Sequence, residues 1–199
     1  QPKLDIRSGR LVGVEALSRW FHPERGLISP TAFVHALEQT GLISSFNQWV
    51  LGTAIEQAAR WQDQGLCFKV AVNLSVHSLL NPAFPDELES LLDNWGISDQ
   101  LMLEITENLF LSDYGRLSQT LLRLQRRGVH FSIDDFCTGH SSLSRLKRLP
   151  VSELKIDRSF VIDMEKNPDD AVIVHSTIEL AHNLGLIVAA EGVENAGIL

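Results

Sequence analysis

Short apolar runs that each end in a polar or charged residue recur along this sequence. Buried parallel strands read as such runs because helices cover both faces of a parallel sheet. Polar residues at the carboxyl ends of parallel strands meet on one face of a barrel, where active sites are built. The pattern predicts a cluster of five carboxylates, one amide and one lysine, suited to metal ions and a phosphate. The six runs are Val12–Glu15, Val70–Asn73, Leu101–Glu104, Phe131–Asp135, Glu153–Lys155 and Val188–Glu191.

The spacing of these runs predicts the fold class. From Asn73 onward, successive strand ends lie roughly 20 to 36 residues apart, and a strand–helix–strand unit takes about 30. The alternation, without repeat or linker, predicts one α/β domain over residues 1–199 with a mostly parallel sheet. Leu4–Arg7 and Arg10–Val14 flank Ser8-Gly9, a two-residue hairpin signal, so we expect an antiparallel first strand. Helices are predicted from Pro30 to Gly41, from about Ser45 to Gln64, from Pro85 to Trp95, from Ser112 or Asp113 to Gly128, and from Asp169 or Asp170 to near Gly185.

Composition excludes several classes of protein. Apolar residues make up 44% of the 199 residues, enough for a sizeable core. No run of 18 apolar residues is present, so no membrane span is expected. The net charge of −8 argues against binding to nucleic-acid polymers, although bound cations can reverse the local sign for a small phosphorylated ligand. Cys67 and Cys137 are expected to be reduced thiols.

Asp134-Asp135 is the strongest local signal. Adjacent acids at the end of an apolar strand repel each other unless a cation lies between them. Two metal ions about 3.5–4 Å apart need a bridging carboxylate, and such pairs promote displacement at phosphorus. The alternative is a solvated turn.

The other strand-end residues each allow a functional and an ordinary explanation. Arg19, four residues after Glu15, could form a forked contact with a phosphate or a surface ion pair. Asn73 is an oxygen ligand for hard cations, but asparagine also favours helix caps and turns.

The same ambiguity applies to the later motifs. Glu104 can face the rim while Glu107, three residues on, lies in the loop or caps the next helix. Lys155 can hold a metal-bound water and balance developing negative charge, or neutralise Asp157. Glu191 ends the last run, and the glycine after it indicates a close backbone approach or a positive φ. Because no histidine or cysteine cluster has metal-site spacing, carboxylates favour Mg²⁺ or Mn²⁺ over zinc.

Together these motifs resemble the EAL-domain family of cyclic di-GMP-specific phosphodiesterases. The resemblance covers nearly the whole chain. The matching segments are EALSRW at 15–20, Asn73-Leu74-Ser75, EITE at 104–107, DDF at 134–136, TGHSSL at 138–143, LKIDRSFV at 154–161 and AEGVE at 190–194.

The resemblance implies a TIM-like (β/α)8 barrel with an antiparallel first strand, and hydrolysis of cyclic di-GMP. It implies that Lys155 positions the nucleophilic water, that Arg19 contacts a substrate phosphate and that Leu17 lies against the substrate. It implies that Glu107 steadies the loop after the aspartate pair. Two Mg²⁺ or Mn²⁺ ions would be held by Glu15, Asn73, Glu104, Asp134, Asp135 and Glu191.

The chain departs from the family pattern at three places. Cys137 stands where the family usually has glycine, and a positive φ there would cost about 1 kcal/mol or more. His140 stands where an aromatic residue is usual. The family's terminal strand is absent after Leu199, and such barrels usually run to about 250 residues, so we expect a domain that lacks its last strand and helix.

The resemblance also implies partners and a setting. Family members are usually fused to sensory or receiver domains, often form homodimers and act in the cytoplasm. An alternative function is a receptor that binds cyclic di-GMP without cleaving it, but every ligand position and the lysine are kept. A lyase barrel of the enolase type would need a paired lysine base, which this sequence lacks.

Overall fold

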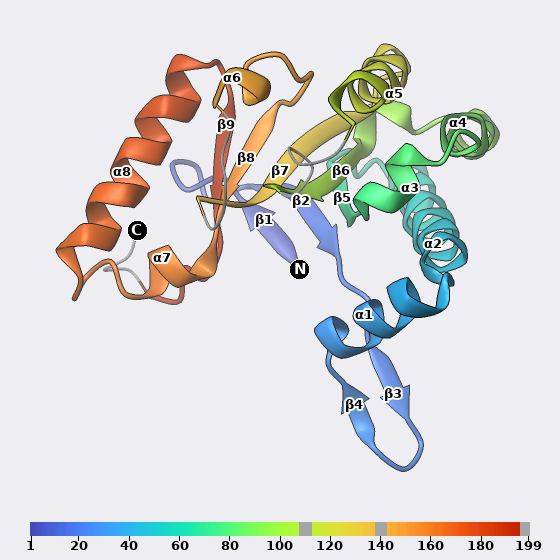
Figure 1. Cartoon of the computed structure of the whole chain (residues 1–199), viewed down its shortest axis with the longest axis horizontal. Helices are drawn as coiled ribbons and strands as arrows, with labels where there is room; N and C mark the ends of the chain where they lie inside the picture. The colour runs from blue at the N-terminus through green and yellow to red at the C-terminus, as the bar shows by residue number, and fades with distance from the viewer. Residues whose placement is uncertain (108–112, 138–142, 196–199) are drawn as a thin grey trace. The chain divides into compact units, whose positions relative to one another are not determined.

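The computed structural model describes residues 1–107, 113–137 and 143–195 (Figure 1). The chain divides into two compact units, Gln1–Met102 with Arg127–Val129, and Leu103–Arg126 with His130–Leu199. The main sheet has the strand order β1-β2-β5-β6-β7-β8-β9. Five of the six apolar runs that predicted strands lie within strands of this sheet, and the sixth, Val188–Glu191, extends one residue past the end of its strand.

The first unit contains the antiparallel start and the longest helix. Its elements are β1 (Pro2–Leu4), β2 (Leu11–Ala16), β3 (Trp20–His22), β4 (Gly26–Ile28), α1 (Pro30–Thr40), α2 (Ile43–Asp63), β5 (Lys69–Asn73), α3 (Val76–Leu80), α4 (Phe84–Trp95) and the 3₁₀ turn η1 (Ser98–Gln100). Strand β1 pairs antiparallel with β2, as predicted, and β2 pairs parallel with β5. Helix α2 packs on β5 and buries Leu51, Ile55 and Ala58.

The second unit holds the remaining strands and helices. Strand β6 (Leu101–Thr106) begins in the first unit and continues here. The other elements are α5 (Tyr114–Arg126), β7 (His130–Phe136), α6 (Leu143–Leu146), β8 (Glu153–Ile156), α7 (Arg158–Ile162), α8 (Pro168–Asn183) and β9 (Ile187–Ala190). Strands β7, β8 and β9 pair in parallel, and α8 packs on β8 and β9 (Figure 1). Both faces of β8 are buried, as a parallel strand under helices requires.

The predicted helix ends are largely confirmed. They were placed at glycines, which can adopt the left-handed conformation that stops a helix. Gly41 and Gly96 follow α1 and α4 with φ of 72° and 68°. The last long helix, α8, begins at Pro168, one or two residues before the predicted start at Asp169 or Asp170. Asn167 caps it, and its side chain accepts a hydrogen bond from the amide of Asp169 at 3.1 Å.

The predicted two-residue turn at Ser8-Gly9 was wrong. β1 ends at Leu4 and β2 begins at Leu11, so the connection spans residues 5–10. The Asp5 carboxylate accepts hydrogen bonds from the amide and hydroxyl of Ser8 at 2.7 and 2.6 Å, and the Gly9 amide donates to the Asp5 carbonyl. An aspartate that bonds the backbone ahead of it forms a turn of its own, which replaces the tighter hairpin.

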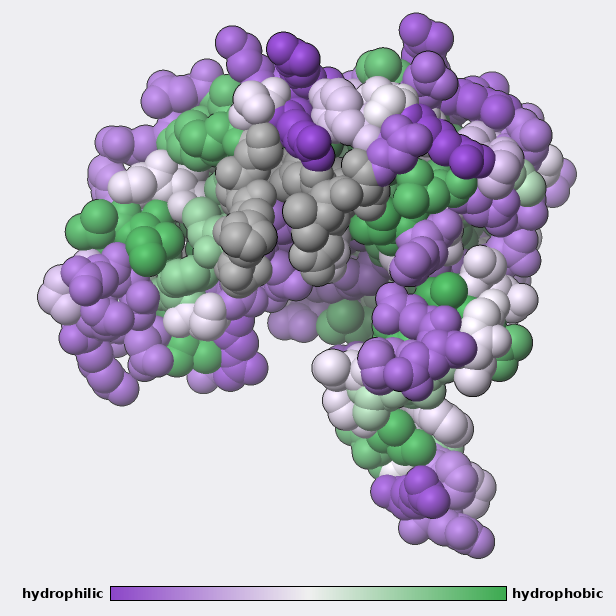
Figure 2. Space-filling view, viewed as in Figure 1, coloured by the Kyte–Doolittle hydropathy of each residue, from purple (hydrophilic) through white to green (hydrophobic). Residues whose placement is uncertain are grey.

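A second hairpin, β3–β4, was not predicted. It pairs Trp20 with Ile28 and projects beside α1 (Figure 1). Trp20, Phe21 and Leu27 on it are exposed, and in Figure 2 the apolar surface of this arm gives way to hydrophilic residues at its tip. Three-residue strands are too short to show an alternating pattern, so no periodicity in the sequence predicts this hairpin.

Two expectations from composition can be checked. Both cysteines are free thiols. Within the described residues, no helix has the length and apolarity needed to cross a membrane.

Candidate functional site

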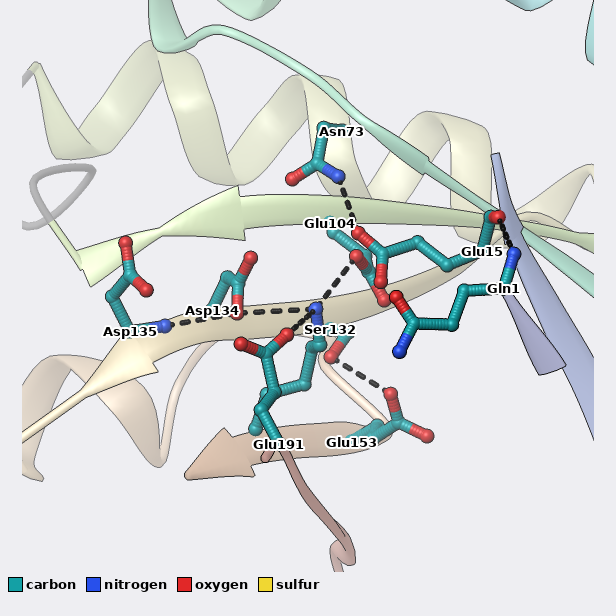
Figure 3. Close-up of polar contacts among 10 residues, drawn as sticks. Gln1, Glu15, Asn73, Glu104, Ser132, Asp134, Asp135, Glu153 and Glu191 are labelled. Atoms are coloured by element: carbon teal, nitrogen blue, oxygen red, sulfur yellow. Dashed lines mark hydrogen bonds and ion pairs between the residues drawn. The ribbon is translucent and has the colours of Figure 1, made fainter. Parts of the chain in front are cut away.

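Lys155 lies at the centre of a buried charge cluster in the second unit. Its ammonium nitrogen lies 2.7 Å from Glu191 Oε1, 2.9 Å from Glu104 Oε2 and 3.2 Å from Asp134 Oδ1. Figure 3 shows these three carboxylates pointing toward one another. The Lys155 side chain is 3% exposed and that of Glu104 is fully buried. An ammonium has three hydrogens, so three acceptors match its hydrogen-bonding capacity.

Strand geometry explains how these groups meet. Side chains alternate between the two faces of a strand, so Lys155 points to the opposite face from Leu154 and Ile156, which pack in the core. Because β7, β8 and β9 are parallel neighbours, residues at equivalent heights lie side by side. One ammonium against three carboxylates leaves an excess of negative charge, which a bound cation would offset.

Asp135 lies next to this cluster in a strained backbone conformation. Its φ is 55°, in the left-handed region, and the pairing of β7 with β8 shifts register between Ile133 and Phe136. Such a bulge can re-aim side chains near an active site. The Asp135 amide donates to Asp134 Oδ1 at 3.0 Å. The two adjacent acids therefore share one short, irregular stretch of β7.

The charge environment of Asp135 is unusual. Burial raises its pKa to about 6, and the negative charges of Asp134, Asp157 and Glu191 add to the shift, while Lys155 opposes it. The predicted repulsion at the aspartate pair is thus present, with Asp157 as a further contributor. Asp157 itself caps α7 by accepting a hydrogen bond from the amide of Ser159.

Asp135 is expected to make the metal-free protein less stable as the pH rises from about 4 to about 6. Because its folded-state pKa lies above the ordinary 3.8, the folded protein keeps a proton that the unfolded chain has released in this window. The stabilisation is therefore complete below about pH 4 and lost as the pH rises through about 6. Asp135→Asn removes this titration. Its melting temperature relative to the unchanged protein, measured in a chelator, should rise across the window, and a constant difference would contradict the assignment.

In the first unit, Glu15 and Asn73 form a second, smaller polar pair. They lie near the ends of the parallel strands β2 and β5, and Asn73 Nδ2 donates to Glu15 Oε1 at 2.7 Å (Figure 3). The amino-terminal group of Gln1 donates to the Glu15 carbonyl at 2.8 Å, which ties β1 to the same position. The amide group of Asn73 is thereby oriented by a carboxylate, as is common for groups around metal sites.

The remaining predicted residues are placed less specifically. Arg19 Nη1 donates to the carbonyl of Ser18 at 3.0 Å, and Leu17 is 37% exposed, both in the first unit. Glu107 is buried in the second unit. The loop that it was expected to steady, which includes His140, lies outside the described residues.

Cys137 and Gly192 both have a positive φ. At Gly192 this is one of the two explanations given for the glycine, and at Cys137 it is the conformation in which a cysteine is unfavourable. Cys137 has φ of 75°, and its sulfur lies 3.3 Å from the Thr177 hydroxyl on α8. Gly192 also has φ of 75°, and a Cβ there would come within 2.6 Å of Arg158 Cγ. Arg158 was not singled out as a site residue. Its guanidinium forms an ion pair with the carboxylate of Glu194, two residues after this glycine, at 2.7 Å. Because Arg158 and Glu194 are 36 residues apart in the sequence, no local pattern predicts that they pair.

The donor set fits hard divalent cations, although the described side chains are not arranged around one. Across residues 1–107, 113–137 and 143–195, no group of three or more His, Cys, Asp or Glu side chains is arranged to hold a metal ion. The reason is visible in the second unit, where the Lys155 ammonium lies among the carboxylates. Carboxylate and amide oxygens nevertheless suit Mg²⁺ or Mn²⁺, and the excess negative charge around Asp135 favours a cation.

Comparison with known proteins identifies relatives over the full sequence. The family model described as EAL domain matches residues 1–199. The bifunctional diguanylate cyclase/cyclic di-GMP phosphodiesterase MucR of Pseudomonas aeruginosa is 43% identical over 196 residues, covering 98% of this chain and 29% of that protein. A cyclic di-GMP phosphodiesterase of the same organism is 37% identical over 195 residues, covering 98% of this chain and 33% of its own length. The chain thus spans about a third or less of these curated relatives.

The fold is also shared with solved structures. The PaMucR phosphodiesterase in complex with c-di-GMP superposes with a TM-score of 0.95 at 42% identity, covering 100% of this chain and 81% of that one. The predicted fold class, a TIM-like α/β architecture with an antiparallel first strand, is confirmed by this match and by the observed strand pairing.

Proposed function

Because the chain belongs to the EAL domain family, we propose that it hydrolyses cyclic di-GMP to linear pGpG with the help of divalent metal ions, in bacterial second-messenger signalling. The observation that carries the proposal is the buried Lys155 cluster with Glu104, Asp134 and Glu191. Those four positions match the family motifs. The names of the relatives support the substrate, since two are cyclic di-GMP phosphodiesterases and one solved structure holds c-di-GMP.

The proposed reaction adds water to one phosphorus of the substrate. One P–O3′ bond breaks, and the leaving oxygen gains a proton. The resemblance assigns two Mg²⁺ or Mn²⁺ ions to Glu15, Asn73, Glu104, Asp134, Asp135 and Glu191. Such ions, when bound, lower the pKa of water and stabilise the charge that develops at phosphorus.

The protein side chains would do the remaining work. Lys155 would exchange one of its three carboxylate contacts for the attacking water, and its charge would balance negative charge in the transition state. Arg19, exposed and able to form a forked contact, would bind a substrate phosphate, and Leu17 would contact the substrate beside it. Glu107 would steady the loop after the aspartate pair.

The wider setting belongs to the same proposal. Residues 1–199 would act as one EAL domain, as a homodimer in the cytoplasm, controlled by fused sensory or receiver domains. The relatives are longer proteins, which is consistent with such fusions.

Chromatography of cyclic di-GMP after incubation with the protein tests the activity. With Mg²⁺ or Mn²⁺ we expect one product with the mass of the linear dinucleotide, and with a chelator none. Ca²⁺ should support binding but little hydrolysis, because its larger and more flexible ligand shell misplaces the water.

Two outcomes would change the proposal. If the nucleotide binds in calorimetry but stays intact with Mg²⁺ and Mn²⁺, the chain is a receptor, the alternative function. Full activity in the chelator would refute the metal dependence.

A further inference from the structure

We infer that Asn47, a helix residue outside the predicted site, is a positioning residue for the Glu15–Asn73 pair, and the inference rests on the proposed function. The residues that carry the argument all belong to the first unit. They link helix α2 to the segment that follows strand β5.

Asn47 occupies a position where an apolar residue would be expected. It is 5% exposed on α2, and Ile43 and Leu51, one turn before and after it, are buried apolar residues. Residues four apart lie on the same helix face, so Asn47 interrupts the apolar stripe. Burying an amide without hydrogen bonds is unfavourable, because the group loses its bonds to water. The residue is therefore compatible with the core only if its amide is satisfied.

The amide nitrogen of Asn47 donates hydrogen bonds to two serines beyond β5. Asn47 Nδ2 donates to Ser78 Oγ at 2.7 Å and lies 3.3 Å from Ser75 Oγ. The two hydroxyls are 3.3 Å apart, and Ser75 Oγ also accepts from the Ser78 amide as the cap of α3. One buried side chain thus fixes the first turn of α3 from the neighbouring helix.

Helix α3 needs this external support. It has five residues, Val76–Leu80, and a helix this short is not stable by itself. Asn73 lies two residues before the Ser75 cap, and the intervening Leu74 is buried. The path of the backbone after Asn73, the last residue of β5, is therefore set by the packing of Leu74 and by the hydrogen bonds from Asn47. Asn73 in turn donates to Glu15, so the chain of contacts runs from α2 to a proposed metal ligand.

The geometry defines which variants are informative. A small cavity lies beside Asn47, lined also by Ser78, Gln48 and Glu87. Truncation to alanine would enlarge it, so Asn47→Leu, of similar volume, removes the hydrogen bonds with less disturbance of packing. Ser78→Ala removes the closest partner from the other side. Leu51→Ala is the matched control, because it weakens the same helix face and has no hydrogen bond to the serines.

Mn²⁺ titration by calorimetry, with metal alone, tests the inference. Loss of groups that orient ligands typically costs about 10–100-fold in metal affinity. We expect Asn47→Leu and Ser78→Ala to weaken Mn²⁺ binding about 10-fold, and Leu51→Ala to lower the melting temperature with affinity changed less than about twofold. In an Asn73→Ala background, Asn47→Leu should have no further effect on affinity. Equal weakening by Leu51→Ala, or unchanged affinity in Asn47→Leu, would overturn the inference.

Hydrogen exchange in a chelator gives a readout that is independent of metal and activity. Amides of residues 73–80 should exchange faster in Asn47→Leu than in Leu51→Ala when both are compared at equal global stability. If the unchanged protein binds no divalent ion, the proposed function fails, and this experiment still judges whether Asn47 positions the segment. Unchanged exchange over residues 73–80 would show that it does not.

Discussion

Replacing Lys155 by methionine is expected to abolish hydrolysis and to lower the melting temperature of the metal-free protein. Methionine has a similar length but no charge, so Glu104, Asp134 and Glu191 would lose their common partner. Breaking a buried ion pair by removing one partner costs about 3–5 kcal/mol. A group that positions water and balances charge in the transition state is worth at least about 100-fold in rate.

The same variant also tests whether a cation can bind among these carboxylates. Without the ammonium, the carboxylates repel each other, and a divalent ion would relieve that repulsion. We therefore expect Mg²⁺ to raise the melting temperature of Lys155→Met more than that of the unchanged protein. Affinity for cyclic di-GMP should change little, because the lysine acts in the transition state.

Lys147→Met is the matched control, since Lys147 is exposed on the surface of the same unit. It should leave both rate and melting temperature nearly unchanged. Equal loss of nucleotide affinity and of turnover in Lys155→Met would contradict its proposed role. A melting temperature that does not respond to Mg²⁺ would argue against a cation beside Glu104 and Asp134.

Much of the fold could be predicted because its signals are local. The apolar runs indicated strands, and glycines after helices indicated where helices stop, as at Gly41 and Gly96. The tight turn at Ser8-Gly9 could not be predicted correctly, because the Asp5 side chain competes for the same backbone groups. That competition depends on hydrogen bonds that no dipeptide preference includes.

That Lys155 and Asp134 lie on one face could be predicted, but the geometry of their contact could not. Both residues lie near the carboxyl ends of predicted parallel strands, which meet on one face, and this pattern sets no distance between the two side chains. That the ammonium contacts three carboxylates at once depends on the parallel register of β7, β8 and β9. Asn47 stands out in the sequence only as a polar residue in an apolar helix stripe, and its role can be inferred only when its partners, Ser75 and Ser78, are known.

Glu15→Ala is expected to reduce the rate of metal-dependent hydrolysis more than about 100-fold. Loss of a group that only orients a metal ligand typically lowers activity about 10–100-fold, so the effect should be larger than that. Glu15 is a proposed metal ligand and the acceptor for the Asn73 amide at 2.7 Å. Removing the Glu15 carboxylate therefore takes away a negative charge and also the acceptor of the hydrogen bond that orients the Asn73 side chain. Turnover of cyclic di-GMP and calorimetric binding of Mn²⁺ measure the two consequences.

Glu15→Gln separates charge from hydrogen bonding at this position. Its side-chain carbonyl can still accept from Asn73 Nδ2, whereas the anionic ligand is gone. If the charge binds a cation, Glu15→Gln should lose nearly as much Mn²⁺ affinity as Glu15→Ala. If Glu15 serves only to orient Asn73, the glutamine variant should keep most of the affinity and rate. Glu24→Ala, an exposed acid on the β3–β4 hairpin, should behave like the unchanged protein. Near-normal rates in Glu15→Ala would remove Glu15 from the metal site, because no ligand of a catalytic ion is dispensable in that way.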